Sequence, residues 1–211
     1  MTKDKSVYWN HYYKTVSNTD SHPQIPSQFA AFVAQEINLE FSIVDVGCGN
    51  GRDSAFFANL GFNVLGLDSS QSAVELCRKR SGHHKENLAY ECCSVSDENF
   101  ESVISEHLGR QPLLIYSRFF LHAITEDEEK LFLQRISDME QIRVIALEFR
   151  TDRDLSQPKA TSDHFRRFIA PSDFSHKVYA QGFKISYFAE GFGFAKYRND
   201  DAHVARFLLH R

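Results

Sequence analysis

The sequence predicts an α/β fold in which helices cover both faces of a doubly wound, mostly parallel sheet of seven strands. Short apolar runs alternate with helical patterns through the middle of the chain, and several runs are apolar at nearly every position, as in strands covered on both faces. Near the end two runs follow each other without a helix, which predicts an antiparallel hairpin. The strands are predicted at 41–46, 62–67, 87–92, 112–117, 142–149, 183–190 and 202–210.

Helical patterns fill the intervals between these strands and also precede the first one. Ser27 is the predicted N-cap of a helix over 28–37, which should cap the fold rather than join the sheet. An aromatic cluster with Tyr8 and Tyr12 on one face predicts a short helix ahead of it. We therefore expect one domain, with a helical cap or lid over 1–38 and a core over 39–211. The later helices are predicted at 52–60, 70–81, 97–109, 126–138 and 171–181.

Composition excludes several classes of function. The 211 residues carry a formal net charge of −4, so no global positive field attracts nucleic acid. No apolar run approaches the roughly 20 residues of a membrane span, and no apolar core follows the N-terminus as in a secretory signal. We expect a cytoplasmic protein with a small-molecule partner, bound to neither nucleic acid nor membrane.

The cysteines point to a reducing compartment. There are four, of which Cys92 and Cys93 are adjacent and Cys48 lies in a glycine-rich segment. This arrangement suits reduced thiols better than a disulfide framework, and it lacks zinc spacing. We therefore expect no metal site.

The first strand and the segment after it carry the main functional signal. Asp45 ends the apolar part of the strand, and Gly47, Gly49 and Gly51 follow at every second position. Such glycines let the backbone turn sharply and let a bulky ligand lie against bare peptide. The second strand ends in Asp68, about 20 residues on, where a carboxylate can accept the hydroxyls of a ribose. The pattern predicts a ribose-bearing cofactor.

Residues 45–51 and 66–70 resemble the first and second motifs of the class I S-adenosylmethionine-dependent methyltransferases. The G-x-G-x-G spacing differs from the G-x-G-x-x-G of dinucleotide dehydrogenases and argues against a nicotinamide cofactor. The resemblance implies a Rossmann-like fold, an enzyme and S-adenosyl-L-methionine as its cofactor. The two closing strands match the end of that fold.

The resemblance also implies roles for individual residues at the cofactor. In the family the first loop contacts the methionine part, and the second acid holds the ribose. An acid near Ser94 often touches the adenine; this chain has serine there, and Asp97 is a possible substitute. The predicted cofactor-binding residues are Asp45, Gly47, Cys48, Gly49, Asp53, Asp68, Ser69, Ser94, Val95, Ser117 and Tyr12.

The ends of the fourth and fifth strands should face the methyl acceptor. Where many family members carry an acid or an Asn-Pro pair, this chain has Ser117-Arg118, which disfavours amine methylation of the Asn-Pro type. His122 has an unperturbed pKa near neutrality and is a candidate general base, with Glu148 as the other. An acceptor that is already an oxyanion needs no base.

Several arginines follow these two strands and predict an anionic acceptor, because guanidinium groups pair with phosphate or carboxylate. The segment 151–170 is long for a plain connection and adds more basic residues. The alternative is a solvated loop whose charges pair locally. The predicted acceptor-binding residues are Arg118, His122, Arg150, Arg166, Arg167 and Tyr8.

A narrower resemblance rests on residues 116–122, 148–150 and 164–168. They resemble a subgroup of bacterial methyltransferases found with surface-polysaccharide genes, which implies O-methylation of a sugar, or of a phosphate or phosphoramidate attached to one. Two alternatives stay open: a small-molecule S- or N-methyltransferase of the thiopurine or tellurite-detoxifying kind, and a non-catalytic regulator that binds S-adenosylmethionine. The N-terminal aromatics form either a lid or a packing layer, and the protein is either a monomer or a homodimer.

Overall fold

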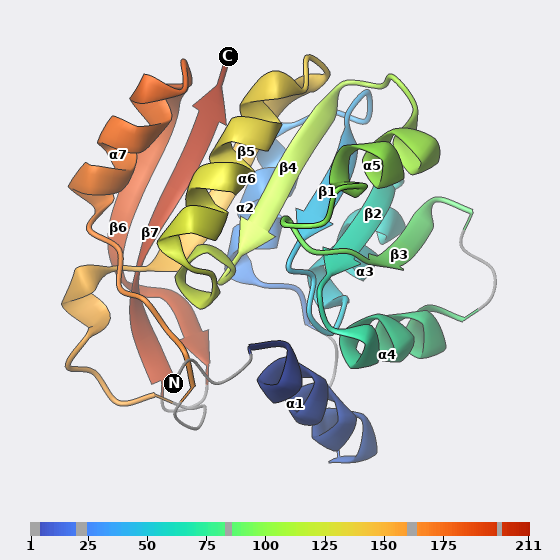
Figure 1. The fold of residues 1–211 in the computed structure, drawn as a ribbon, viewed down its shortest axis with the longest axis horizontal. Coiled ribbons are helices and arrows are strands. Elements are labelled where there is room, and N and C mark those ends of the chain that lie inside the picture. Colours follow the sequence, from blue (N-terminus) through green and yellow to red (C-terminus); the bar gives the residue numbers. More distant parts are fainter. Residues whose placement is uncertain (1–4, 20–24, 83–85, 160–163, 198–199) are drawn as a thin grey trace.

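Seven strands form a single sheet in this computed structural model, which describes residues 5–19, 25–82, 86–159, 164–197 and 200–211. The strand order is β3-β2-β1-β4-β5-β7-β6, and β7 runs antiparallel to the other six strands (Figure 1). The strands are β1 (Ser42–Val46), β2 (Asn63–Asp68), β3 (Leu88–Cys92), β4 (Leu113–Arg118), β5 (Ile142–Arg150), β6 (Lys184–Tyr197) and β7 (Asp200–His210).

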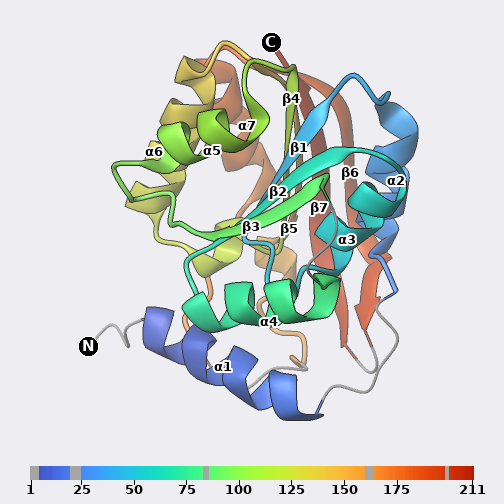
Figure 2. The ribbon, with the colours of Figure 1, turned by 90° about the vertical axis from the view of Figure 1, so that its right-hand side faces the viewer.

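Helices cover both faces of this sheet, as Figures 1 and 2 show. The α-helices are α1 (Lys5–Thr19), α2 (Gln28–Glu36), α3 (Arg52–Asn59), α4 (Gln71–Ser81), α5 (Phe100–Leu108), α6 (Glu126–Asp138) and α7 (Pro171–Ala180), and two short 3-10 turns are η1 (Leu121–Ala123) and η2 (Asp152–Asp154). One apolar layer joins α2 and α3 to the sheet, and the other joins α5, α6 and α7. None of the described helices combines the length and apolar composition of a membrane span.

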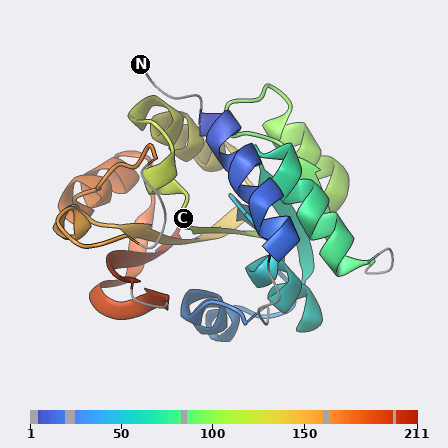
Figure 3. The same ribbon diagram turned by 90° about the horizontal axis from the view of Figure 1, so that it is seen from below.

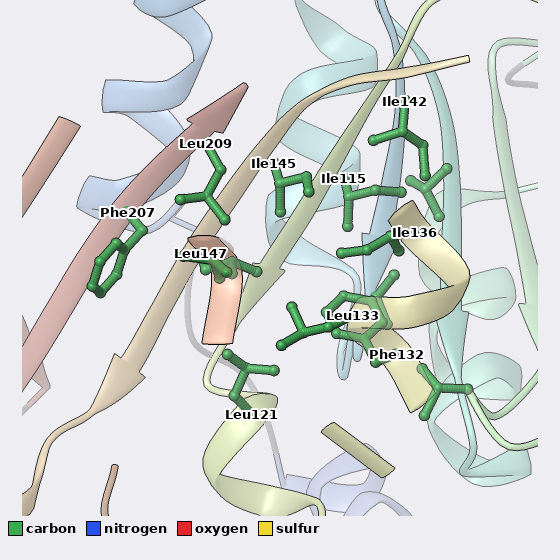
Figure 4. Close-up of a cluster of buried hydrophobic side chains, with 14 of the residues drawn as sticks. Ile115, Leu121, Phe132, Leu133, Ile136, Ile142, Ile145, Leu147, Phe207 and Leu209 are labelled. Carbon is green, nitrogen blue, oxygen red and sulfur yellow. The ribbon is translucent and has the colours of Figure 1, made fainter. Parts of the chain in front are cut away.

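The larger apolar layer lies between α6 and the strands β4, β5 and β7, as Figure 4 shows. Phe132 and Ile136 of α6 are fully buried against Ile115 and Ile145 of the strands. Because the central strands bury side chains on both faces, they appear in the sequence as continuous apolar runs. The predicted bounds of the first five strands lie within one residue of the structure for this reason.

The prediction for the C-terminal hairpin was wrong in one respect. Residues 191–195 were expected to separate the last two strands, but β6 continues through them to Tyr197. The pairing with β7 shifts between Gly191 and Ala195, and Gly193 has φ of 83°. The glycines therefore form an irregularity inside the strand rather than a turn. The first helix is also longer than predicted.

The direction of winding reverses between β1 and β4, which lie side by side with their carboxyl ends at one edge of the sheet. Such a reversal leaves a crevice, because the connections from the two strands diverge to opposite sides. Helix α1 lies across this edge and runs beside α4, as Figures 2 and 3 show. The fold therefore places the N-terminal helix over the edge where ligands bind in sheets of this kind.

A buried polar network joins the two helices of the smaller apolar layer to β4. Asp53, in the first turn of α3, accepts hydrogen bonds from the Ser27 N–H and hydroxyl, both at 2.7 Å, and from the Tyr116 hydroxyl at 2.8 Å. Ser27 also caps α2, as predicted, by accepting from the Ala30 N–H at 3.0 Å. Asp53, one of the predicted cofactor ligands, thus has both oxygens engaged by α2 and β4.

Replacement of Asp53 by alanine should destabilise the fold and leave cofactor affinity almost unchanged. Three buried donors would lose their acceptor, which costs about 2–4 kcal/mol in the free energy of unfolding. Denaturant unfolding and calorimetric titration with S-adenosylhomocysteine measure the two quantities. A variant with normal stability and weakened binding would instead support the cofactor role.

Candidate functional site

Three aromatic rings from three different elements close on the glycine loop. A Cβ on Gly47 would stand 2.8 Å from the ring of Phe120, one on Gly49 would stand 2.5 Å from the Tyr13 hydroxyl, and one on Gly51 would stand 2.7 Å from the Tyr90 hydroxyl. All three glycines have positive φ. Any side chain at these positions would clash or strain the backbone, so the loop stays bare.

Asp68 ends β2 directly beside this loop. Its Oδ2 accepts from the Gly49 N–H at 2.9 Å, and its Oδ1 accepts from the Ser70 N–H at 2.8 Å. Burial raises the pKa of this carboxyl, and the two backbone donors oppose the rise. A carboxylate oxygen can accept a second hydrogen bond, so Asp68 keeps acceptor capacity for a ligand hydroxyl.

The adenine end of the predicted site lies after β3. Ser94 donates its backbone N–H to the Asp97 carboxylate at 2.8 Å, and Val95 beside it is buried. Asp97, which the sequence offered as a substitute for the acid that the family often carries near Ser94, therefore lies beside Ser94. Ser69, exposed after β2, faces the same region through its carbonyl, which accepts from the Cys92 thiol at 3.7 Å.

Three predicted cofactor residues have side chains engaged beneath the loop. Asp45 is buried and accepts from the Ser54 hydroxyl at 2.5 Å, and its burial raises the carboxyl pKa to about 8. The Ser117 hydroxyl donates to the Val46 carbonyl at 3.0 Å. The Cys48 thiol is buried against Gly66. These side chains shape the loop from below.

Helix α1 reaches the glycine loop through Tyr13, one of the aromatic residues of the expected lid, and contacts α4 through Asn10, which the sequence did not single out. Tyr12 was the predicted residue, but Tyr13 reaches Gly49, and burial followed by the nearby Asp68 charge raises the pKa of its phenol. Asn10 accepts from the Ser70 hydroxyl at 2.9 Å and from the Ser72 N–H at 3.2 Å. The aromatic cluster signalled this helix, but nothing in the sequence distinguished Tyr13 from its neighbours.

The other end of α1 contacts the segment before α7. The Tyr8 ring stacks on His164 with centroids 4.5 Å apart, and Trp9 meets the same imidazole edge-on at 5.1 Å. Lys5 pairs with Glu128 at the start of α6. Tyr8, predicted at the acceptor, therefore lies beside the segment that carries the predicted arginines.

The chain reverses sharply after β4 at Phe119, whose φ of 59° is the only positive value among the described residues other than glycine. This turn brings Phe120 against Gly47 and places His122 in η1. His122 is buried, and its Nδ1 accepts weakly from the Arg150 N–H at 3.4 Å. Burial, and then the charge of Arg150, holds the pKa of the imidazole well below its usual value, so His122 is neutral at pH 7.

Glu148 lies between two guanidinium groups and is buried. Its Oε1 accepts from Arg118 Nε and its Oε2 accepts from Arg206 Nε, each at 2.7 Å. Among the described residues, neither terminal nitrogen of Arg118 has a hydrogen-bond partner, and its side chain is 16% exposed. Arg206 was not predicted from the sequence; it lies in β7, far along the chain, and only the antiparallel pairing of β7 with β5 brings it here.

The other predicted arginines have partners within the protein. Arg150 is buried between Asp154 and Asp200, at 2.6 and 2.5 Å. Arg167 pairs with the buried Glu129 of α6, which also binds Lys177 at 2.7 Å. Arg166 is half-buried beside the His164 ring. These three contacts anchor the segment after β5. Arg118 differs, because it lies at the edge of the sheet and its two terminal nitrogens have no hydrogen-bond partner among the described residues.

The residues of this edge fit S-adenosylmethionine. The loop contains three glycines with positive φ, and a Cβ at any of them would occupy the space above the backbone. Asp68 lies beside the loop and can accept a further hydrogen bond. Gly47 and Gly49 would face the methionine part, Asp68 the ribose, and Ser94 with Asp97 the adenine. No group of His, Cys, Asp and Glu side chains within the described ranges is arranged to hold a metal ion.

Comparison with known proteins agrees with a methyltransferase domain. Residues 43–139 match the family described as a methyltransferase domain. The chain is 31% identical over 65 residues to a ubiquinone biosynthesis O-methyltransferase of Coxiella burnetii, and the match covers 30% of this chain and only 28% of that relative.

Two solved structures share the fold along nearly the whole chain. An S-adenosylmethionine-dependent methyltransferase from Anabaena variabilis has a TM-score of 0.73 at 21% identity, covering 99% of this chain and 96% of that one. Magnesium protoporphyrin IX methyltransferase from Synechocystis, solved with bound S-adenosylhomocysteine, has a TM-score of 0.63 at 15% identity, covering 98% and 85%.

Residues 43–139 thus match a methyltransferase domain, and the fold of the chain is that of the S-adenosylmethionine-dependent methyltransferases. The predicted class I methyltransferase fold and the predicted cofactor, S-adenosyl-L-methionine, are confirmed at the level of this domain. The acceptor and the roles of single residues remain predictions.

Replacement of Asp68 by alanine should weaken the binding of S-adenosylhomocysteine by about 1–3 kcal/mol, the contribution of hydrogen bonds to a charged group. Isothermal calorimetry measures the affinity. Replacement of Asp97 by alanine serves as the comparison at the adenine end, with a smaller loss. Unchanged affinity in Asp68→Ala would remove this residue from the ribose role.

Asp45 should make the stability of the fold depend on pH. Between an unfolded pKa near 3.8 and the folded value of about 8, the folded state keeps a proton that the unfolded state has lost. The free energy of unfolding therefore falls by about 1.4 kcal/mol for each unit that the pH rises through this range. The contribution is fully present below pH 4 and is lost as the pH passes 8.

Asp45→Asn tests this dependence, because asparagine is neutral at every pH and its carbonyl still accepts from the Ser54 hydroxyl. We expect the variant to gain stability relative to the natural protein at pH 8 and to lose that advantage towards pH 5, as measured by urea unfolding. Parallel pH profiles for the two proteins would contradict the shift.

Proposed function

We propose that the protein is an S-adenosylmethionine-dependent methyltransferase that O-methylates a small anionic acceptor. By the narrower sequence resemblance, the acceptor is a sugar, or a phosphate or phosphoramidate linked to a sugar, in surface-polysaccharide biosynthesis. The observation that supports an anionic acceptor is the guanidinium group of Arg118, at the carboxyl end of β4 beside the glycine loop. Among the described residues, its two terminal nitrogens have no hydrogen-bond partner and could bind an anion.

The charges around Arg118 support this proposal. Glu148 is a single carboxylate shared by two guanidinium groups, Arg118 and Arg206, so this largely buried trio carries one surplus positive charge, with Arg118 as its partly exposed member. An uncompensated charge removed from water is unfavourable, and an anion that pairs with it restores the balance. By contrast, Arg150 and Lys159 are matched by Asp154 and Asp200. These four charges balance one another, whereas the trio has two guanidinium groups for one carboxylate.

S-adenosylmethionine supplies an electrophilic methyl group on a sulfonium, together with its own leaving group. The task left to this chain is to hold the acceptor oxygen in place and to keep water out. We propose that α1 acts as the lid, with Tyr13 and Asn10 over the cofactor side and Tyr8 over the acceptor side. Arg118 binds the negative charge of the acceptor.

The surroundings of the two predicted bases favour an acceptor that is already an oxyanion. His122 accepts at Nδ1, so its neutral imidazole carries the proton on Nε2 and can donate a hydrogen bond there rather than remove a proton. Glu148 has both oxygens occupied by guanidinium N–H groups. A phosphate or carboxylate oxygen needs no base, and in this proposal His122 binds it.

Oxygen is the favoured acceptor atom on one further ground. The curated relative from Coxiella burnetii is named an O-methyltransferase, although the match covers a small part of it. The surplus positive charge at Arg118 does not favour the S- or N-methylating alternative, because neutral thiols and amines do not pair with a guanidinium group.

Calorimetry with S-adenosylmethionine and S-adenosylhomocysteine, followed by transfer of a labelled methyl group, tests the function. Glucose 6-phosphate and glucuronic acid are the anionic acceptors, and glucose and a neutral thiol are the controls. We expect binding of both cofactor forms and turnover of the anions alone. Cofactor binding without turnover of any acceptor would support the regulatory alternative.

Arg118→Met should raise the KM for the anionic acceptor about tenfold or more, because a charge-assisted hydrogen bond contributes about 1.5–3 kcal/mol, and should leave cofactor affinity unchanged. Lys130→Met, which removes one exposed positive charge from α6, is the matched control and should behave as the natural protein. Equal effects of the two variants would show a nonspecific influence of net charge and would contradict the role of Arg118.

A further inference from the structure

Phe119 holds an unfavourable backbone conformation that a glycine would adopt without cost. Its φ of 59° lies in the left-handed region, where a bulky aromatic residue is rare. Such residues gather at functional sites, where the surrounding structure maintains them for a purpose. The turn alone does not require a side chain here, so the benefit must come from the ring.

The ring of Phe119 supports three groups of the proposed acceptor site. The Arg118 guanidinium lies over its face at 4.3 Å from the centroid, the Arg150 guanidinium at 5.3 Å, and the His122 ring packs against it at 5.2 Å and 67°. In an extended strand the side chains of residues 118 and 119 would point to opposite sides. The left-handed turn returns the ring to the side of Arg118.

Of these three groups, Arg118 depends most on the ring. Arg150 is held by two carboxylates, and His122 is buried within η1. Arg118 has one hydrogen bond among the described residues, from Nε to Glu148, and a single bond leaves the plane of the guanidinium free to rotate. The flat face of Phe119 removes that freedom, because a stacked guanidinium lies parallel to the ring.

We propose that Phe119 is a positioning residue that, together with Glu148, fixes the fork of Arg118 for an acceptor with a carboxylate or phosphate group. The inference rests on the proposed function and adds a preference among acceptors. Two parallel N–H donors in a fixed plane favour an acceptor group with two oxygens, such as carboxylate or phosphate, over a single negative oxygen. Phe119 itself need not touch the acceptor.

Four variants distinguish the effect of the Phe119 ring from the effects of its backbone conformation and of the Arg118 charge. Phe119→Tyr keeps the aromatic face, Phe119→Leu keeps an apolar side chain without it, Phe119→Gly relieves the backbone and removes the ring, and Arg118→Lys keeps the charge without the fork. Dissociation constants for glucose 6-phosphate and inorganic phosphate are measured on protein saturated with S-adenosylhomocysteine, and the affinity for S-adenosylhomocysteine and the melting temperature are recorded for each variant.

We expect the two constants to rise about tenfold in the leucine and glycine variants, the effect of losing a shielded cation–π contact, and to stay within about twofold in the tyrosine variant. Affinity for S-adenosylhomocysteine should not change. A second readout is the Nε–H proton resonance of Arg118, identified by its loss in Arg118→Lys. The ring should shift this resonance upfield in the natural protein and in Phe119→Tyr, and not in Phe119→Leu.

Equal phosphate affinity in the natural protein and Phe119→Leu would overturn the positioning role and leave the proposed function standing. The same holds if Phe119→Tyr loses as much affinity as Phe119→Leu, since the aromatic face would then not be the cause. If the natural protein binds neither phosphate nor glucose 6-phosphate, the anionic acceptor itself is overturned, and this inference with it.

Discussion

The absence of three side chains, at Gly47, Gly49 and Gly51, is the constraint on which the rest of the site depends. Each glycine has a positive φ and lies under an aromatic ring from a different element: the turn after β4, helix α1 and strand β3. A methyl group at any of them would push one of these elements away from the loop. The spacing at every second residue therefore serves more than the cofactor, because it brings distant parts of the chain onto one edge of the sheet.

The two sides of this edge are held by different forces. On the cofactor side, Asp68 is fixed by backbone N–H donors, and the loop is supported from below by small buried groups. On the acceptor side, ion pairs dominate: Arg150 ties β5 to Asp154 and Asp200, and Arg167 ties its segment to Glu129. Buried pairs of this kind fix geometry more than they add stability. The open fork of Arg118 contrasts with these closed pairs.

Helix α1 joins the two sides. Near its middle, Asn10 and Tyr13 contact the start of α4 and the glycine loop. Near its beginning, Lys5 pairs with α6, and Tyr8 stacks on His164. Because one helix carries both sets of contacts, a movement that exposes the cofactor edge also disturbs the acceptor edge. This physical link supports the proposal that α1 is a lid rather than a packing layer alone.

The sequence by itself determined the α/β class, the bounds of the first five strands, the glycine loop and the acid of β2, because each depends on neighbours within a few residues. Apolar runs, caps and glycine spacing are local signals. It also put forward Arg118 and His122 as candidates from their place at the end of a strand, and their roles stay predictions. The hairpin was misjudged, because a glycine inside a strand and a glycine in a turn look alike without the partner strand.

Only the tertiary structure decided which of many similar charged side chains have all their hydrogen bonds within the protein and which keep donors available for a ligand. Arg118, Arg150 and Arg167 look alike in the sequence, and each pairs with an acid that the fold brings from another element. Among the described residues, however, Arg118 keeps both terminal nitrogens without a hydrogen-bond partner. Arg206 and Tyr13 reach the site from opposite ends of the chain. Ion pairs and ring contacts between distant elements leave no periodic trace in the sequence, because they depend on where the strands and helices pack.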